Sequence, residues 1–175
     1  MGKLCRPKFV VSLLVLMGFV VNAATAPAIS FQIIQHDSSQ EKIRSASAVV
    51  ENSFFDYFFD QGNIVTNFPT AVSFSDPEDL SIYYKSLDES QEGLCHYFIA
   101  LIMEYDVSAS YNPEAVILRN IKEIKWELFD VKSGKKLISG KKLVGPIKES
   151  SDNRNGVAVL SRAVASEINK FLIER

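Results

Sequence analysis

The stretch that decides the fold is residues 45–72, which read SASAVVENSFFDYFFDQGNIVTNFPTAV. Apolar residues recur here at helical spacing on one face. Gly62 predicts the end of the helix, because glycine readily adopts the left-handed conformation that often follows a helix. The β-branched Ile64 and Val65 then favour a buried strand. We expect this helix and strand to build the core, with these residues on the inner face of the helix: Ile43, Ala46, Val50, Phe54, Tyr57 and Phe58.

The rest of the chain predicts more strands and helices around this unit. Ser75-Asp76-Pro77-Glu78 is typical of a helix start, with proline and acidic residues in the first turn. The nearly continuous apolar run of residues 94–103 favours a central strand buried on both faces. The predicted strands are 29–35, 63–74, 94–103, 121–131 and 136–144, and the predicted helices are 39–61, 75–91 and 157–173. The fold class is α/β (α+β), a mixed β-sheet with three helices in the order β-α-β-α-β-β-β-α.

Residues 1–28 have the layout of a secretory signal peptide. Three basic residues precede an apolar run from Phe9 to Val21, and small residues follow. The run has 13 residues, whereas a membrane span needs about 20. We therefore expect cleavage between residues 23 and 28, and the alternative is a retained anchor. Residues 29–175 then form a single α/β domain without a transmembrane span, in the periplasm or secreted.

Charge and cysteine content exclude several classes of protein. Residues 29–175 hold 16 basic and 21 acidic residues, a net charge of −5. A general nucleic-acid-binding protein carries a basic footprint instead, so we expect no nucleic-acid partner. Cys95 is the one cysteine after the leader, so no disulfide within the mature chain is expected. A buried free thiol is the simplest interpretation of Cys95, and an intermolecular disulfide is the alternative.

No residue pattern of this chain is typical of catalysis or of a cofactor. His36 and His96 have no metal-ligand neighbour at a useful sequence spacing, so no metal site is expected. His96 and Cys95 are adjacent in a predicted strand, so their side chains point to opposite faces and cannot form a catalytic pair. A pair between His36 and Cys95 in space remains an alternative. The chain is therefore predicted not to be an enzyme and to need no cofactor.

A lysine-rich hairpin stands out in this acidic chain. Gly134 occupies its turn, where a positive φ favours glycine. One interpretation is an exposed or edge strand that lysines protect from pairing with other strands. The other is a contact site for an anionic surface or an acidic partner. The candidate contact residues are Lys132, Lys135, Lys136, Lys141 and Lys142.

The order of these elements also resembles a known group of bacterial envelope domains. The long helix, the strand at Gly62–Asn67 and the turn Asp130-Val-Lys-Ser-Gly-Lys135 carry the resemblance. It is to the amino-terminal domain of TolB, the curli-secretion lipoprotein and the lipoprotein activators of penicillin-binding proteins. Those families share the helix, the strand, a hairpin turn of the Asp-x-x-Ser/Thr-Gly-Lys kind and a carboxy-terminal helix. The resemblance covers most of residues 30–175 and implies an envelope location with a protein partner. The chain lacks a lipobox cysteine, and no functional residue carries over.

Taken together, these features predict an exported, non-catalytic envelope protein that acts as a protein-interaction or assembly module. The alternative function is a periplasmic small-ligand-binding protein. Its pocket would be lined by the aromatic residues of 54–59 and by Tyr83 and Tyr84. Core aromatics and ligand-binding aromatics have the same sequence pattern, so both functions remain open at this point.

Overall fold

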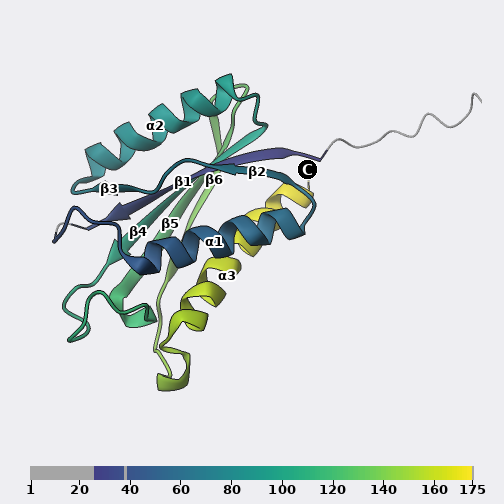
Figure 1. The fold of residues 1–175 in the computed structure, drawn as a ribbon. Helices are drawn as coiled ribbons and strands as arrows, with labels where there is room; N and C mark the ends of the chain where they lie inside the picture. The colour runs from purple at the N-terminus through teal and green to yellow at the C-terminus, as the bar shows by residue number, and fades with distance from the viewer. Residues whose placement is uncertain (1–25, 38, 175) are drawn as a thin grey trace, which may run out of the picture.

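The computed structural model describes residues 26–37 and 39–174 (Figure 1). Most of the predicted signal peptide therefore lies outside the described residues. Nine helices and strands make up the described part, and two short 3-10 turns at residues 118–120 and 149–151 join some of them. They are β1 (Ala28–His36), α1 (Ser45–Asp60), β2 (Ile64–Asn67), β3 (Ala71–Ser73), α2 (Asp76–Glu92), β4 (Tyr97–Tyr105), β5 (Ile121–Asp130), β6 (Lys135–Leu143) and α3 (Arg154–Ile173).

The six strands form one mixed sheet, as predicted. The strand order is β2-β1-β4-β5-β6, and β3 also pairs with β1. β1 is parallel to β2, β3 and β4, whereas β5 is antiparallel to both β4 and β6. β4 is central and largely buried, as its apolar run predicts. It begins at Tyr97 rather than at residue 94, and Leu94 precedes the strand and is 83% exposed. β6 lies at one edge, as the first interpretation of its lysines requires.

The predicted strand 63–74 was wrong in two respects. It is divided into β2 and β3 by residues 68–70, which include Pro69, because proline has no N–H to continue a strand ladder. It is also not buried. β2 is at the sheet edge, and Ile64 is 63% exposed. The β-branched pattern therefore identified the strand correctly but not its burial.

Helices cover the two faces of the sheet unequally. α1 and α3 pack together on one face, and α2 lies on the other (Figure 1). Phe54 and Phe58 of α1 are fully buried in the larger core, where the Phe54 ring meets Phe31 of β1 with 5.0 Å between centroids. This confirms that the phenylalanine-rich helix builds the core. Tyr83 and Leu87 of α2 pack with Phe98 and Phe129 in the smaller core on the other face.

α1 begins six residues later than predicted. The expected start at Ser39 lies in a loop that a buried ion pair holds against β1. Arg44 is 3% exposed, and its Nε donates to Asp37 Oδ2 over 2.5 Å. Ser39 also donates to Asp37. These polar contacts keep residues 39–44 out of the helix.

Candidate functional site

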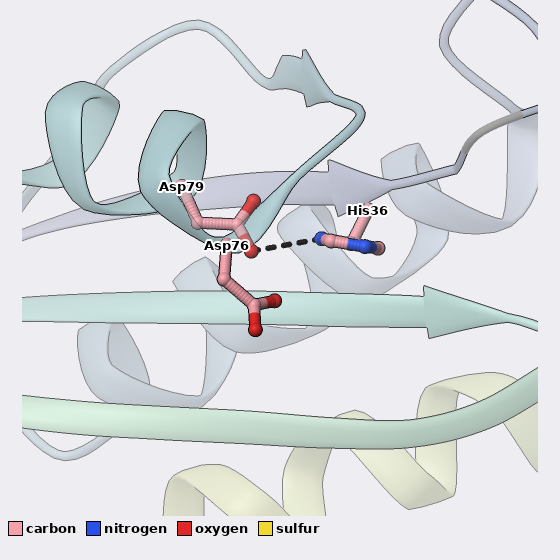
Figure 2. Close-up of side chains that lie close together, drawn as sticks. All are labelled: His36, Asp76 and Asp79. Atoms are coloured by element: carbon pink, nitrogen blue, oxygen red, sulfur yellow. Dashed lines mark hydrogen bonds and ion pairs between the residues drawn. The ribbon is translucent and has the colours of Figure 1, made fainter.

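At the carboxyl end of β1, three side chains of types that can bind a metal ion lie close together. His36 is the last residue of β1, and Asp76 and Asp79 lie in the first two turns of α2. His36 Nδ1 is 2.8 Å from Asp79 Oδ2. One nitrogen or oxygen atom from each of the three side chains lies within 4.8 Å of the others. Figure 2 shows the Asp79 carboxylate directed at the His36 ring, with the Asp76 carboxylate beside them.

Asp79 is unusual because its carboxylate is buried. The residue is 3% exposed, and its Oδ1 atom is buried without a hydrogen-bond partner. No lysine or arginine of the described residues lies within ion-pair distance of it, so His36 is its one charged or ionisable partner there. The amino terminus of α2 favours a carboxylate electrostatically. A buried carboxylate still costs free energy unless a cation and hydrogen bonds satisfy it.

This cluster was missed by the sequence analysis. The sequence shows no ligand neighbour of His36 at a useful spacing, because Asp76 and Asp79 are 40 or more residues away in the chain. The expectation of no metal site stays a prediction. The two aspartates reach His36 because β3 pairs with β1, with Ser73 opposite His36, and α2 begins three residues later. The one available signal was the acidic helix start, which is common in helices without a ligand.

A second polar cluster at this edge, on the α1 face, is structural. Arg44 contacts Asp37, Glu114 and the carbonyl of Pro113, and its guanidinium lies 5.3 Å from the Tyr105 ring centroid. Burial alone would raise the pKa of Asp37, but hydrogen bonds from Arg44 and Ser39 outweigh it and hold that pKa below its usual value. Burial raises the pKa of Tyr105 to about 12. Every charge here has a partner, so the cluster joins two loops to the sheet.

A strained residue, Leu94, lies at the opposite end of the strands, just before β4 begins. α1 and α2 end in the same way, with Gly62 and Leu94 each donating a backbone N–H back to the last turn. Both have positive φ, +80° for Gly62 and +56° for Leu94. Gly62 confirms the predicted glycine cap. Leu94 is the single non-glycine residue with positive φ among the described residues. A side chain in this conformation costs about 1–2 kcal/mol, so Leu94 replaces the usual glycine at a cost.

Leu94 also exposes its side chain at an apolar end of the molecule. It is 83% exposed, and Phe59, Ile64 and Ile173 are each more than half exposed. Two backbone hydrogen bonds connect the strand starts at this end. The N–H of Ile64 donates to the carbonyl of Pro27, and the N–H of His96 donates to the carbonyl of Ala28. Figure 1 shows the ends of α1 and α3 and the starts of β1 and β2 at this end. We call Phe59, Ile64, Leu94 and Ile173 the apolar end.

A recess lies beside Leu94. It has a volume of about 400 Å³ and is lined in part by Leu94, Cys95, Tyr97 and Val131. Lys132, one of the predicted contact residues, is also part of its wall. Gln91, His96 and Asp130 complete the lining, so the recess combines apolar and polar side chains.

The structure separates the five predicted contact lysines into two groups. Lys136 pairs with Glu127 at 3.0 Å, Lys141 with Glu123 at 3.7 Å, and Lys142 with Glu167. Lys132 and Lys135 lie in or next to the exposed hairpin turn, and no carboxylate of the described residues is within ion-pair distance of them. Contact of the hairpin with an anion stays a prediction, and these two lysines are its best candidates.

Two alternatives from the sequence are wrong. Phe54, Phe58 and Tyr83 are buried in the cores, whereas Phe59 and Tyr84 are exposed. Because α1 and α2 lie on opposite faces of the sheet, these aromatic residues do not line one shared pocket. His36 and Cys95 lie at opposite ends of the strands, because His36 is opposite Glu104 while Cys95 precedes Tyr97. Tyr97 and Glu104 are seven positions apart in β4, or about 23 Å. His36 and Cys95 therefore form no catalytic pair.

Comparison with known proteins identifies the family. A family model described as "Uncharacterised protein" matches residues 28–172. The chain belongs to this family. The match spans nearly all the described residues. The search of curated proteins found no match to the sequence.

Solved structures share the topology of this family member at low identity. The PelC dodecamer from Paraburkholderia phytofirmans is 13% identical with a TM-score of 0.47, and the match covers 80% of this chain and 85% of that one. TolB from Acinetobacter baumannii is 13% identical with a TM-score of 0.43, over 84% of this chain and 28% of TolB. The LpoB carboxy-terminal domain from Salmonella enterica is 13% identical with a TM-score of 0.40, over 78% and 93%. The predicted topological resemblance is confirmed, and it concerns the fold alone.

Among the described residues, no helix is both long enough and apolar enough to cross a membrane.

Proposed function

We propose that this chain is an exported, non-catalytic module of the bacterial envelope that binds another envelope protein through its apolar end. The leader-like composition of residues 1–28 supports export. The observation that carries the proposal is Leu94, which combines a strained backbone with a side chain that is 83% exposed.

Neither feature of Leu94 helps the domain to fold. Glycine at this position would relieve the backbone strain, as it does at Gly62 after α1. Exposure of a leucine side chain contributes no burial of apolar surface. Backbone strain that persists in a fold is found most often at functional sites. A role for the side chain outside the domain accounts for both costs.

The partner that fits this end offers an apolar pocket with acidic groups near it. Leu94 would enter the pocket, and Phe59, Ile64 and Ile173 would offer further exposed apolar surface at the same end of the molecule. Lys132 stands at the adjacent recess and would meet a carboxylate of the partner. A few residues supply most of the free energy of protein–protein binding, and in this proposal Leu94 is one of them.

Site-specific photocrosslinking in the cell envelope tests this function. A photoreactive phenylalanine analogue replaces Leu94 in one variant and Tyr111 in a control. Tyr111 is also fully exposed, but it lies in the loop that follows β4, beyond the opposite edge of the sheet. One dominant adduct from position 94 and none from position 111 would support the proposal. Equal labelling from both positions, or none from position 94, would refute it.

A further inference from the structure

We propose that His36, Asp76 and Asp79 form a binding site for a divalent transition-metal ion at the carboxyl edge of β1. The ion class is that of Zn²⁺ and Mn²⁺. This site lies at the opposite edge of the sheet from Leu94, so the proposal does not depend on the partner-binding function.

The positions of the ligand atoms suit a metal ion. Metal–ligand distances of about 2.1 Å place neighbouring ligand atoms roughly 3 Å apart. His36 Nδ1 and Asp79 Oδ2 are 2.8 Å apart, close to that spacing. The third ligand is within 4.8 Å of both. Asp76 is exposed at the first position of α2, so a rotation of its side chain can close the remaining gap.

The buried oxygen of Asp79 is the independent observation that favours a cation here. Asp79 Oδ1 is buried and accepts no hydrogen bond, although the same carboxylate is directed at His36 (Figure 2). A neutral His36 satisfies one oxygen and leaves the negative charge uncompensated. A divalent ion beside Oδ2 would neutralise that charge.

The ligand types select the class of metal. Imidazole nitrogen suits zinc and other late transition metals, whereas calcium and magnesium prefer oxygen ligands alone. One histidine and two carboxylates therefore fit Zn²⁺ or Mn²⁺. His36 is part-exposed and Asp76 is exposed, so water can fill the remaining coordination positions.

The competing explanation is a simple histidine–aspartate pair at a helix amino terminus. That pair would need a proton on His36 rather than a metal ion, and Asp76 would have no role in it. Replacement of Asp76 should weaken metal binding if the three residues bind a metal ion, and should leave a simple His36–Asp79 pair intact. Asp76 therefore distinguishes the two explanations best.

Metal binding can be measured by calorimetry on the full mature chain after removal of metal with a chelator. Titration with Zn²⁺ and separately with Mn²⁺ should show saturable binding of one ion per chain, and Ca²⁺ should show none. Asp76→Asn should weaken Zn²⁺ binding more than about tenfold. It should leave the metal-free midpoint of thermal unfolding unchanged, because Asp76 is exposed.

Two matched controls separate this site from adventitious zinc binding. Asp88→Asn removes another exposed carboxylate of α2 and should leave binding unchanged. His36→Gln should abolish binding, whereas His96→Gln should not, because His96 instead accepts a hydrogen bond from Ala28. Absence of saturable binding, or equal affinity in the wild type, Asp76→Asn and His36→Gln, would overturn the proposal.

Discussion

At the scale of single residues, Leu94 and Gly62 form a natural comparison. Both follow a helix in the left-handed conformation, and each donates its N–H to the carbonyl three residues earlier. The next residue, Asn63 or Cys95, donates its N–H to the carbonyl five residues earlier. A Cβ added at Gly62 meets no atom within 4 Å, so the free energy of a substitution there is conformational. The conformational free-energy cost of leucine at such a position can therefore be measured twice, by removing the leucine at position 94 and by introducing one at position 62.

Leu94→Gly should stabilise the domain by about 1 kcal/mol, because glycine adopts positive φ without strain. Gly62→Leu should destabilise it by about 1–2 kcal/mol for the same reason. The free energy of unfolding in urea measures both effects. Leu94→Gly should at the same time lower partner recovery from the envelope. A more stable variant that still binds normally would remove Leu94 from the interface.

Gly140 has a different reason to be glycine. It lies opposite Trp126 in the β5–β6 pair, and an added Cβ would lie 2.4 Å from the Trp126 ring. Gly140→Ala should therefore destabilise the domain by about 1–3 kcal/mol through overpacking. Gly145→Ala serves as the control, since nothing lies within 4 Å of its added Cβ. Urea unfolding that shows equal stability for the two variants would contradict this prediction.

At the scale of elements, β4 and β5 are joined by charges as well as by the strand ladder. Glu104 of β4 pairs with Lys122 at 2.9 Å and also with Lys125, both from β5. Burial alone would raise the pKa of Glu104, but hydrogen bonds from Lys125 and Lys122 outweigh it and lower that pKa. Asp37 behaves in the same way in the loop between β1 and α1. Both carboxylates therefore stabilise the fold in their charged form.

These two groups predict how stability depends on pH. A lowered folded-state pKa means that the unfolded chain binds more protons, so stability falls as the pH falls. The contribution of Glu104 should be complete above its unfolded pKa of about 4.3 and lost as the pH falls through its folded pKa. Glu104→Gln should show a shallower loss of urea stability between about pH 5 and pH 3 than the wild type. Asp88→Asn is the control and should match the wild type, so an unchanged slope in Glu104→Gln would rule the assignment out.

At the scale of the whole molecule, charge is unevenly distributed. α2 holds six carboxylates and one lysine, whereas residues 121–143 hold seven lysines and three carboxylates. Five of these seven lysines, at positions 122, 125, 136, 141 and 142, are in ion pairs with carboxylates of the sheet or α3. Lys132 and Lys135 remain at the turn, next to the recess beside Leu94. This arrangement places unpaired positive charge near the apolar end of an acidic chain.

Lys132→Gln with Lys135→Gln should weaken the Leu94-dependent crosslink at low salt, because a charged rim mainly speeds association. The effect should diminish as salt screens the charges. Crosslink yield across a salt series measures it, with Lys136→Gln plus Lys141→Gln as the matched control of equal charge change. A larger loss of crosslink yield in the Lys136→Gln plus Lys141→Gln control would mean that the partner contacts β6 rather than the hairpin turn.

The sequence by itself determined the elements and the fold class. The periodic apolar residues of 45–72, the glycine cap at Gly62 and the alternation in β5 are local patterns, and local backbone preferences decide them. Hence the three helices, the hairpin and the central position of β4 were all predictable. Boundaries were less so, because the Asp37–Arg44 pair that delays α1 joins residues whose contact the pattern does not show.

Only the tertiary structure decided burial at the edges and the composition of the sites. Ile64 is exposed because β2 is an edge strand, and strand order is a property of the assembled sheet. Asp76 and Asp79 meet His36 because β3 pairs with β1 and α2 follows directly. The strain at Leu94 is equally invisible in sequence. Contacts between distant residues depend on packing, and a one-dimensional pattern carries local preferences alone.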